Sequence, residues 1–177
     1  MEEKLTILKS FFEKPNKEFH IRELSRILNI NHTSVRQYLI KLVKEDFLET
    51  VKGGIYLSYK SNINKKFLNL KLYYNLEKIR MSRIVDDLEK KFDYPVIVIF
   101  GSYASAYDDE NSDIDICIIT NIKKEFNAEK YEKTLHRKAS LHFFSYKEWE
   151  KIKIKNPNLA NNICNGIVLS GQLEVVK

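Results

Sequence analysis

The sequence predicts an α/β (α+β) protein whose two structured halves are joined by a long helix. The first half contains three helical patterns followed by two β-rich runs. A helical stretch without proline or glycine comes next. The second half contains apolar strands, one of which ends at a Gly-Ser pair. We therefore predict domains at residues 1–62 and 92–177, with a linker helix at residues 63–91.

The composition is that of a folded protein. Of the 177 residues, 44% are hydrophobic and 12% are aromatic, which excludes a disordered chain. The longest purely apolar run, residues 96–100, is far shorter than the roughly 20 residues of a membrane helix. No apolar signal segment follows Met1, so we expect a cytoplasmic protein without a membrane partner. We expect Cys117 and Cys164 to be separate buried thiols.

The net charge of +6 lies entirely before residue 96. Residues 1–64 hold eleven Lys or Arg against eight Asp or Glu, and residues 65–95 hold eight against five. Residues 96–177 hold eleven of each kind. A basic N-terminal part joined to a neutral part favours an anion-binding module. A lysine-rich composition of the source organism would produce the same excess, so that alternative stays open.

Three helical patterns begin the first half. Apolar residues recur at helical spacing over residues 5–12, and Pro15 ends that helix. A second helix is predicted at about residues 20–28. A third begins behind a cap at Asn31 or Thr33.

Two β-rich runs follow at residues 47–51 and 55–59, and the intervening Lys-Gly-Gly predicts a hairpin. Three helices and a hairpin in this order resemble a winged helix-turn-helix domain. The resemblance implies that the third helix enters the major groove of duplex DNA. The candidate DNA contacts are His32, Ser34, Arg36, Gln37, Lys41 and the wing residue Lys52. Protein docking or dimerisation by a solvated charged face is the alternative.

The helical stretch over about residues 65–91 is too long to bury its apolar side within one small domain. We expect a connector that packs on both halves or on a second subunit. Winged-helix proteins commonly bind two DNA half-sites as dimers. The sequence therefore favours a homodimer.

The most informative segment is the apolar strand at residues 96–100, which ends at Gly101-Ser102. Small residues then begin a short helix. Glycine lets the backbone approach a triphosphate closely, the serine hydroxyl can donate to a phosphate oxygen, and the helix N-terminal amides add donors. Gly101 and Ser102 are therefore candidate nucleotide-binding residues.

Asp113 and Asp115 stand in a second apolar strand. The two-residue period of a strand places both carboxylates on one face, toward the same space as the Gly-Ser turn. Two carboxylates beside a triphosphate suit Mg²⁺ (or Mn²⁺), which binds one or two carboxylates together with phosphates and waters. The alternative is an exposed acidic turn with capping aspartates.

At these residues the segment resembles the minimal nucleotidyltransferase domain of the DNA polymerase beta superfamily, whose signature is apolar-Gly-Ser, a gap and Asp-x-Asp. The whole chain is similar to archaeal-type proteins in which a winged helix precedes such a domain. The resemblance implies a mixed sheet with flanking helices, an NTP held at Gly101 and Ser102, and a divalent metal at Asp113 and Asp115. It further implies transfer of a nucleoside monophosphate to an acceptor hydroxyl, with pyrophosphate leaving toward Ser102.

The family pattern includes a third carboxylate on a neighbouring strand, and the run at residues 139–145 contains none. His142 stands near that position, where an imidazole could ligate a metal, accept a proton or make an ordinary hydrogen bond. Asp108, Asp109 and Glu110 either substitute for the missing acid or form a solvated turn. A slow transferase and a non-enzymatic DNA-binding regulator with a degenerate nucleotide-binding or dimerisation domain therefore both stay open.

Two further features have simpler interpretations. His136 and Arg137 could approach phosphates, but a basic helix surface is the preferred prediction. Trp149 is expected to pack on its domain. The sequence contains no zinc-ligand spacing and no dinucleotide-binding glycine motif.

Overall fold

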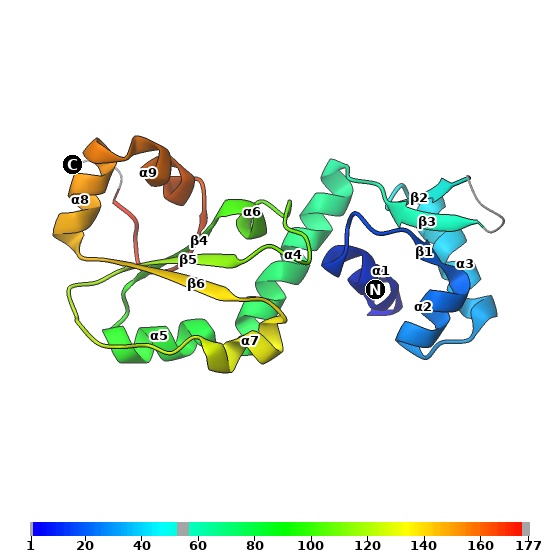
Figure 1. Cartoon of the computed structure of the whole chain (residues 1–177), viewed down its shortest axis with the longest axis horizontal. Helices are drawn as coiled ribbons and strands as arrows, with labels where there is room; N and C mark the ends of the chain where they lie inside the picture. The colour runs from blue at the N-terminus through cyan, green and yellow to red at the C-terminus, as the bar shows by residue number, and fades with distance from the viewer. Residues whose placement is uncertain (1, 53–56, 175–177) are drawn as a thin grey trace. The chain divides into compact units, whose positions relative to one another are not determined.

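The computed structural model describes residues 2–52 and 57–174 (Figure 1). The chain forms two compact units, Met1–Lys71 (unit 1) and Leu72–Lys177 (unit 2). The division falls inside helix α4 (Lys65–Ser82), within the segment predicted as a linker. Among the described residues, no helix combines the length and the apolar character that crossing a membrane requires.

The described part of unit 1 contains the helices α1 to α3, a small antiparallel sheet and the start of α4. The predicted order of three helices and then two strands is present, and the short strand β1 pairs with β3 in the order β1-β3-β2. The Gly-Gly turn of the predicted hairpin lies outside the described residues. The classification as a winged helix-turn-helix stays a prediction. The elements are α1 (Glu2–Glu13), β1 (Phe19–His20), α2 (Ile21–Leu28), α3 (His32–Lys44), β2 (Leu48–Val51) and β3 (Ser58–Ser61).

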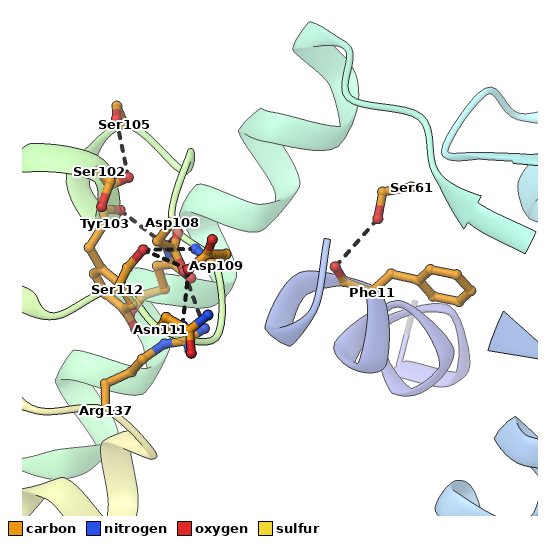
Figure 2. A network of polar contacts seen from close by, with 11 residues as sticks. Phe11, Ser61, Ser102, Tyr103, Ser105, Asp108, Asp109, Asn111, Ser112 and Arg137 are labelled. Atoms are coloured by element: carbon orange, nitrogen blue, oxygen red, sulfur yellow. Dashed lines mark hydrogen bonds and ion pairs between the residues drawn. The ribbon is translucent and has the colours of Figure 1, made fainter. Parts of the chain in front are cut away.

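The core of unit 1 is built from the apolar stripes of its helices. The rings of Phe11 and Phe19 meet edge to face with centroids 5.0 Å apart, and the Ser61 hydroxyl donates to the Phe11 carbonyl (Figure 2). Helix α3 begins where the Asn31 side chain accepts the Ser34 N–H at 2.8 Å, so of the two predicted caps Asn31 is the one used. Other buried apolar side chains are Ile7, Leu8, Leu24, Val35 and Leu39.

The prediction of one continuous helix over residues 63–91 is wrong. Helix α4 ends at Ser82, and α5 (Ile84–Phe92) begins after Arg83, whose φ of 63° lies in the left-handed region. The Ser82 hydroxyl donates to the Ile79 carbonyl and accepts the Ile84 N–H, so it takes over backbone bonding where the helix breaks. No glycine or proline marks this position in the sequence.

Unit 2 is a mixed sheet flanked by helices, which confirms the predicted α/β class. The strand order is β6-β5-β4-β7, with β4 antiparallel to both of its neighbours and β5 parallel to β6. The elements after α5 are β4 (Val96–Phe100), α6 (Gly101–Ala104), β5 (Ile114–Ile119), α7 (Glu129–Leu135), β6 (Ala139–Phe144), α8 (Tyr146–Lys155), α9 (Pro157–Cys164) and β7 (Ile167–Ser170).

Alternating residues of a strand are buried on opposite faces of this sheet. Ile97 and Ile99 of β4 belong to a cluster with residues of α5 and α7. Val96 and Val98, which alternate with them, belong to a cluster with Trp149 of α8 and residues of α9. Figure 1 shows these helix pairs on opposite sides of the sheet. Trp149 therefore packs on its domain as predicted, and this second face also carries the candidate site.

Candidate active site

The site begins where β4 ends. Gly101 has a φ of 73°, a left-handed conformation that glycine adopts without steric cost. A Cβ atom at this position would lie 3.0 Å from Oδ2 of Asp115, because β5 runs beside β4 with Asp115 paired to Phe100. A side chain at residue 101 would therefore press on that carboxylate. Glycine at this position therefore lets the backbone of residue 101 lie close to the Asp115 carboxylate.

Ser102 lies in the single turn of α6. The Ser105 hydroxyl donates to the carbonyls of Gly101 and Ser102, both at 3.1 Å, and the Tyr107 N–H donates to the Ser102 carbonyl at 3.0 Å. Figure 2 shows Ser102 and Ser105 in this turn. The backbone of the predicted Gly-Ser turn is therefore tied to the residues that follow it.

Asp113 directly precedes β5, and Asp115 is the second residue of that strand. Asp113 accepts a hydrogen bond from the Ser140 hydroxyl at 3.0 Å, and the Lys138 ammonium lies 3.9 Å from the same oxygen. The two carboxylate side chains are 43% and 34% exposed. Both aspartates therefore keep access to solvent, from which a cation can reach them.

His142 lies on β6, beside β5. Its Nε2 is 3.1 Å from Oδ1 of Asp115, and its ring centroid is 5.3 Å from that of Phe100. An ionised carboxylate only accepts hydrogen bonds, so Nε2 donates to it in this contact. Used in this way, the imidazole holds the Asp115 carboxylate in place. His142 therefore lies beside Asp115.

The donor set fits a divalent cation that shares its coordination with a substrate. Within residues 2–52 and 57–174, no three His, Cys, Asp or Glu side chains are arranged to hold a metal ion by themselves. Mg²⁺ in nucleotide sites binds one or two carboxylates and completes its shell with phosphate oxygens and waters. Asp113 and Asp115 suit that pattern.

In the acidic loop Glu110 is exposed, as the interpretation of a solvated turn requires, but Asp108 is not. Asp108 is only 1% exposed, and it accepts a hydrogen bond from Asn75 Nδ2 at 2.9 Å. The Arg137 guanidinium lies 3.5 Å from its other oxygen, and that side chain is 4% exposed (Figure 2). The prediction of a basic helix surface at Arg137 is therefore wrong too. The two buried charges lie beside each other, although Asp108 and Arg137 are far apart in the sequence.

A separate cluster of positive charge lies in unit 1. A groove of about 920 Å³ between α2 and the start of α3 is lined by His32 and Arg36, two of the predicted DNA contacts, and by Arg22 and Arg26. The other predicted contacts, Ser34, Gln37, Lys41 and Lys52, do not belong to its lining. Sequence reasoning missed Arg22 and Arg26, although their spacing of four places both on one side of a helix.

The comparisons with known proteins concern unit 2. A family model described as "Polymerase beta, Nucleotidyltransferase" matches residues 82–173, which is more than half of the chain. The matched region contains the Gly101-Ser102 turn, both aspartates of β5 and His142. No curated protein matches the chain.

Proposed function

The chain belongs to the polymerase beta nucleotidyltransferase family, and we propose that unit 2 transfers a nucleoside monophosphate from an NTP to an acceptor hydroxyl group. The observation that carries this proposal is the apposition of Gly101 and Asp115. A Cβ at residue 101 would lie 3.0 Å from Oδ2 of Asp115, so a phosphate approaching this backbone also approaches that carboxylate. Two like charges next to a phosphate repel it unless a cation lies between them.

Each residue then has a defined task. Gly101 admits the triphosphate, and the Ser102 hydroxyl donates to the departing pyrophosphate. Asp113 and Asp115 hold the divalent cation, Mg²⁺ or Mn²⁺, which when bound supplies Lewis-acid polarisation of the α-phosphate. His142 holds Asp115 through the 3.1 Å contact. Because β6 carries no third carboxylate to act as a base, we expect slow or narrowly acceptor-specific transfer.

The direct test supplies NTPs radiolabelled at the α-phosphate, with Mg²⁺ or Mn²⁺ and cell extract as the source of acceptors. We expect label to enter an acceptor only when a divalent cation is present. His142→Ala should lower turnover and divalent-dependent NTP affinity by about 10- to 100-fold, because Asp115 then loses the contact that holds it. Absence of both transfer and NTP binding would favour the non-enzymatic regulator.

A second function is favoured by the cationic groove of unit 1, and we propose that this unit binds duplex DNA. Three arginines of α2 and α3 line one groove, and Glu23, the acidic residue in its lining, is paired with Lys17 at 2.6 Å. An excess of cations suits phosphate contacts, which bind without regard to base sequence. A homodimer binding two half-sites belongs to this proposal and can be checked by light scattering.

Salt dependence tests the DNA proposal. Affinity for genomic duplex fragments should fall steeply between about 50 and 200 mM salt, and Arg36→Ala should reduce the slope of log affinity against log salt by about 1. Lys14→Ala is the control, because Lys14 is an exposed cation of unit 1 that does not line the groove. A DNA affinity that does not change with salt concentration would instead favour protein docking as the function of unit 1.

A further inference from the structure

Unit 2 contains a buried polar cluster whose residues have no part in the proposed chemistry. The cluster, here called the Asp108 cluster, consists of Asn75, Tyr103, Asp108 and Arg137. Asn75 and Asp108 are 2% and 1% exposed, and the Arg137 side chain is 4% exposed. A buried ion pair contributes little net stability, because apolar residues of similar volume replace such pairs at small or no cost. Its contacts with the site suggest a different role.

On one side, the cluster holds the helix that follows Gly101. Asn75 Nδ2 donates both to Oδ1 of Asp108 at 2.9 Å and to the Tyr103 carbonyl at 3.0 Å. The Tyr103 hydroxyl donates to the Asn75 carbonyl at 3.4 Å. Tyr103 directly follows Ser102 in α6. One amide side chain on α4 therefore joins the Gly-Ser turn to Asp108.

On the other side, the cluster holds the start of β6. The Arg137 guanidinium lies 3.5 Å from Oδ2 of Asp108. The carbonyl of the next residue, Lys138, accepts the N–H of Ile114 at 2.8 Å, and Ile114, the first residue of β5, stands between Asp113 and Asp115. The position of Arg137 is therefore linked through one backbone hydrogen bond to the aspartate pair.

The loop between Asp108 and Asp113 holds its own shape. The Asp109 side chain accepts the Asn111 N–H at 2.9 Å and the Ser112 hydroxyl at 3.1 Å (Figure 2). The Ser112 N–H also donates to the Asp109 carbonyl at 3.2 Å. These hydrogen bonds fix the shape of the loop, so a shift of Asp108 also shifts Asp113.

We propose that Asp108 is a positioning residue, which sets the placement of the Asp113/Asp115 pair relative to the Gly101-Ser102 turn through Asn75 and Arg137. It contacts neither nucleotide nor cation. The inference rests on the proposed function of that site. It implies that loosening Asp108 weakens cation and nucleotide binding together, because both halves of the site depend on the same cluster.

The test measures Mn²⁺ binding in the presence of a non-hydrolysable NTP analogue, by the electron paramagnetic resonance signal of free Mn²⁺, alongside the melting temperature. Asp108→Asn keeps the shape of the side chain but removes the negative charge beside Arg137. Asp108→Asn combined with Arg137→Met removes both charges and should recover part of the melting temperature. In both variants we expect Mn²⁺ affinity to fall roughly tenfold or more, as misplaced positioning groups do.

The matched control is Tyr131→Phe, which removes a buried hydroxyl's hydrogen bond to Asp87 elsewhere in unit 2. It should lower the melting temperature and leave Mn²⁺ affinity unchanged. An affinity within about twofold of wild type in the double variant would overturn the positioning role, because the ion pair would then be structural alone. Absence of Mn²⁺ binding by the wild-type protein would instead refute the proposed function, and the inference with it.

Discussion

The sheet face that carries α8 and α9 has a covered end and an open end. Cys117 and Asp115 lie two residues apart on β5 and so point to the same face. The Cys117 side chain is fully buried in the cluster with Trp149 of α8, whereas Asp115 is 34% exposed beside His142. One strand pattern therefore serves as core at one end and as candidate site at the other. Which role a residue has depends on whether the helices cover it.

Burial also separates the chemistry of the two ends. It raises the pKa of the Cys117 thiol from its ordinary value of 9.0 to about 12, so the thiol stays protonated at neutral pH. A protonated buried thiol is neither a nucleophile nor a metal ligand. The carboxylates at the open end keep contact with water and can exchange it for a cation.

The largest expected effect comes from removing both carboxylates of the open end. Asp113→Asn combined with Asp115→Asn should weaken divalent-dependent NTP binding by about a hundredfold or more, since amides replace the anionic ligands that Mg²⁺ prefers. The fold should persist because both side chains are partly exposed. Calorimetry with Mg²⁺ measures the affinity. Glu110→Gln is the control, because Glu110 is an exposed acid of the adjacent loop. Equal NTP affinity in the wild type and the double variant would contradict the assignment of Asp113 and Asp115 as cation ligands.

A smaller effect is expected from Gly101→Ala. The left-handed conformation disfavours alanine by about 1–2 kcal/mol, and the added Cβ would press on Asp115. We expect both a lower free energy of unfolding and a loss of nucleotide affinity of roughly tenfold, equivalent to about 1.4 kcal/mol.

Gly171→Ala is the matched control, because Gly171 also has a positive φ, of 71°, but lies against Pro95 and Val96, at the opposite end of β4 from Gly101. It should lose stability while nucleotide affinity stays unchanged. A parallel loss of affinity in both variants would show that the two ends of the sheet are not independent.

The smallest expected effect concerns the covered end alone. The Cys117 pKa is higher in the folded than in the unfolded protein, so the folded state retains a proton that the unfolded state loses above about pH 9. This contribution to stability is complete below that pH and falls by up to about 1.4 kcal/mol per pH unit toward the folded pKa. Urea unfolding between about pH 8 and 10.5 should show a steeper decline for wild type than for Cys117→Ala. An equal decline of stability with pH in the two proteins would mean that the Cys117 thiol is not shielded from water.

The sequence by itself determined the elements whose causes are local. An apolar run predicted β5, and the two-residue period of a strand predicted that Asp113 and Asp115 lie on one face. The end of β4 at Gly101 follows from the one residue type that adopts a left-handed turn freely. The cap at Asn31 needed only a short polar side chain before an apolar helix. Such features depend on residues within one turn or one strand.

The tertiary structure alone decided which charged residues are buried and which meet. Asp108 has the same sequence surroundings as its exposed neighbour Glu110, yet it is enclosed with Arg137 and Asn75. His142 reaches Asp115 only because β6 pairs in parallel with β5. The solvation of a charge depends on partners that come from other elements, and no local pattern specifies those partners. Chain folding therefore separates the buried carboxylate of Asp108 from the partly exposed carboxylates of Asp113 and Asp115.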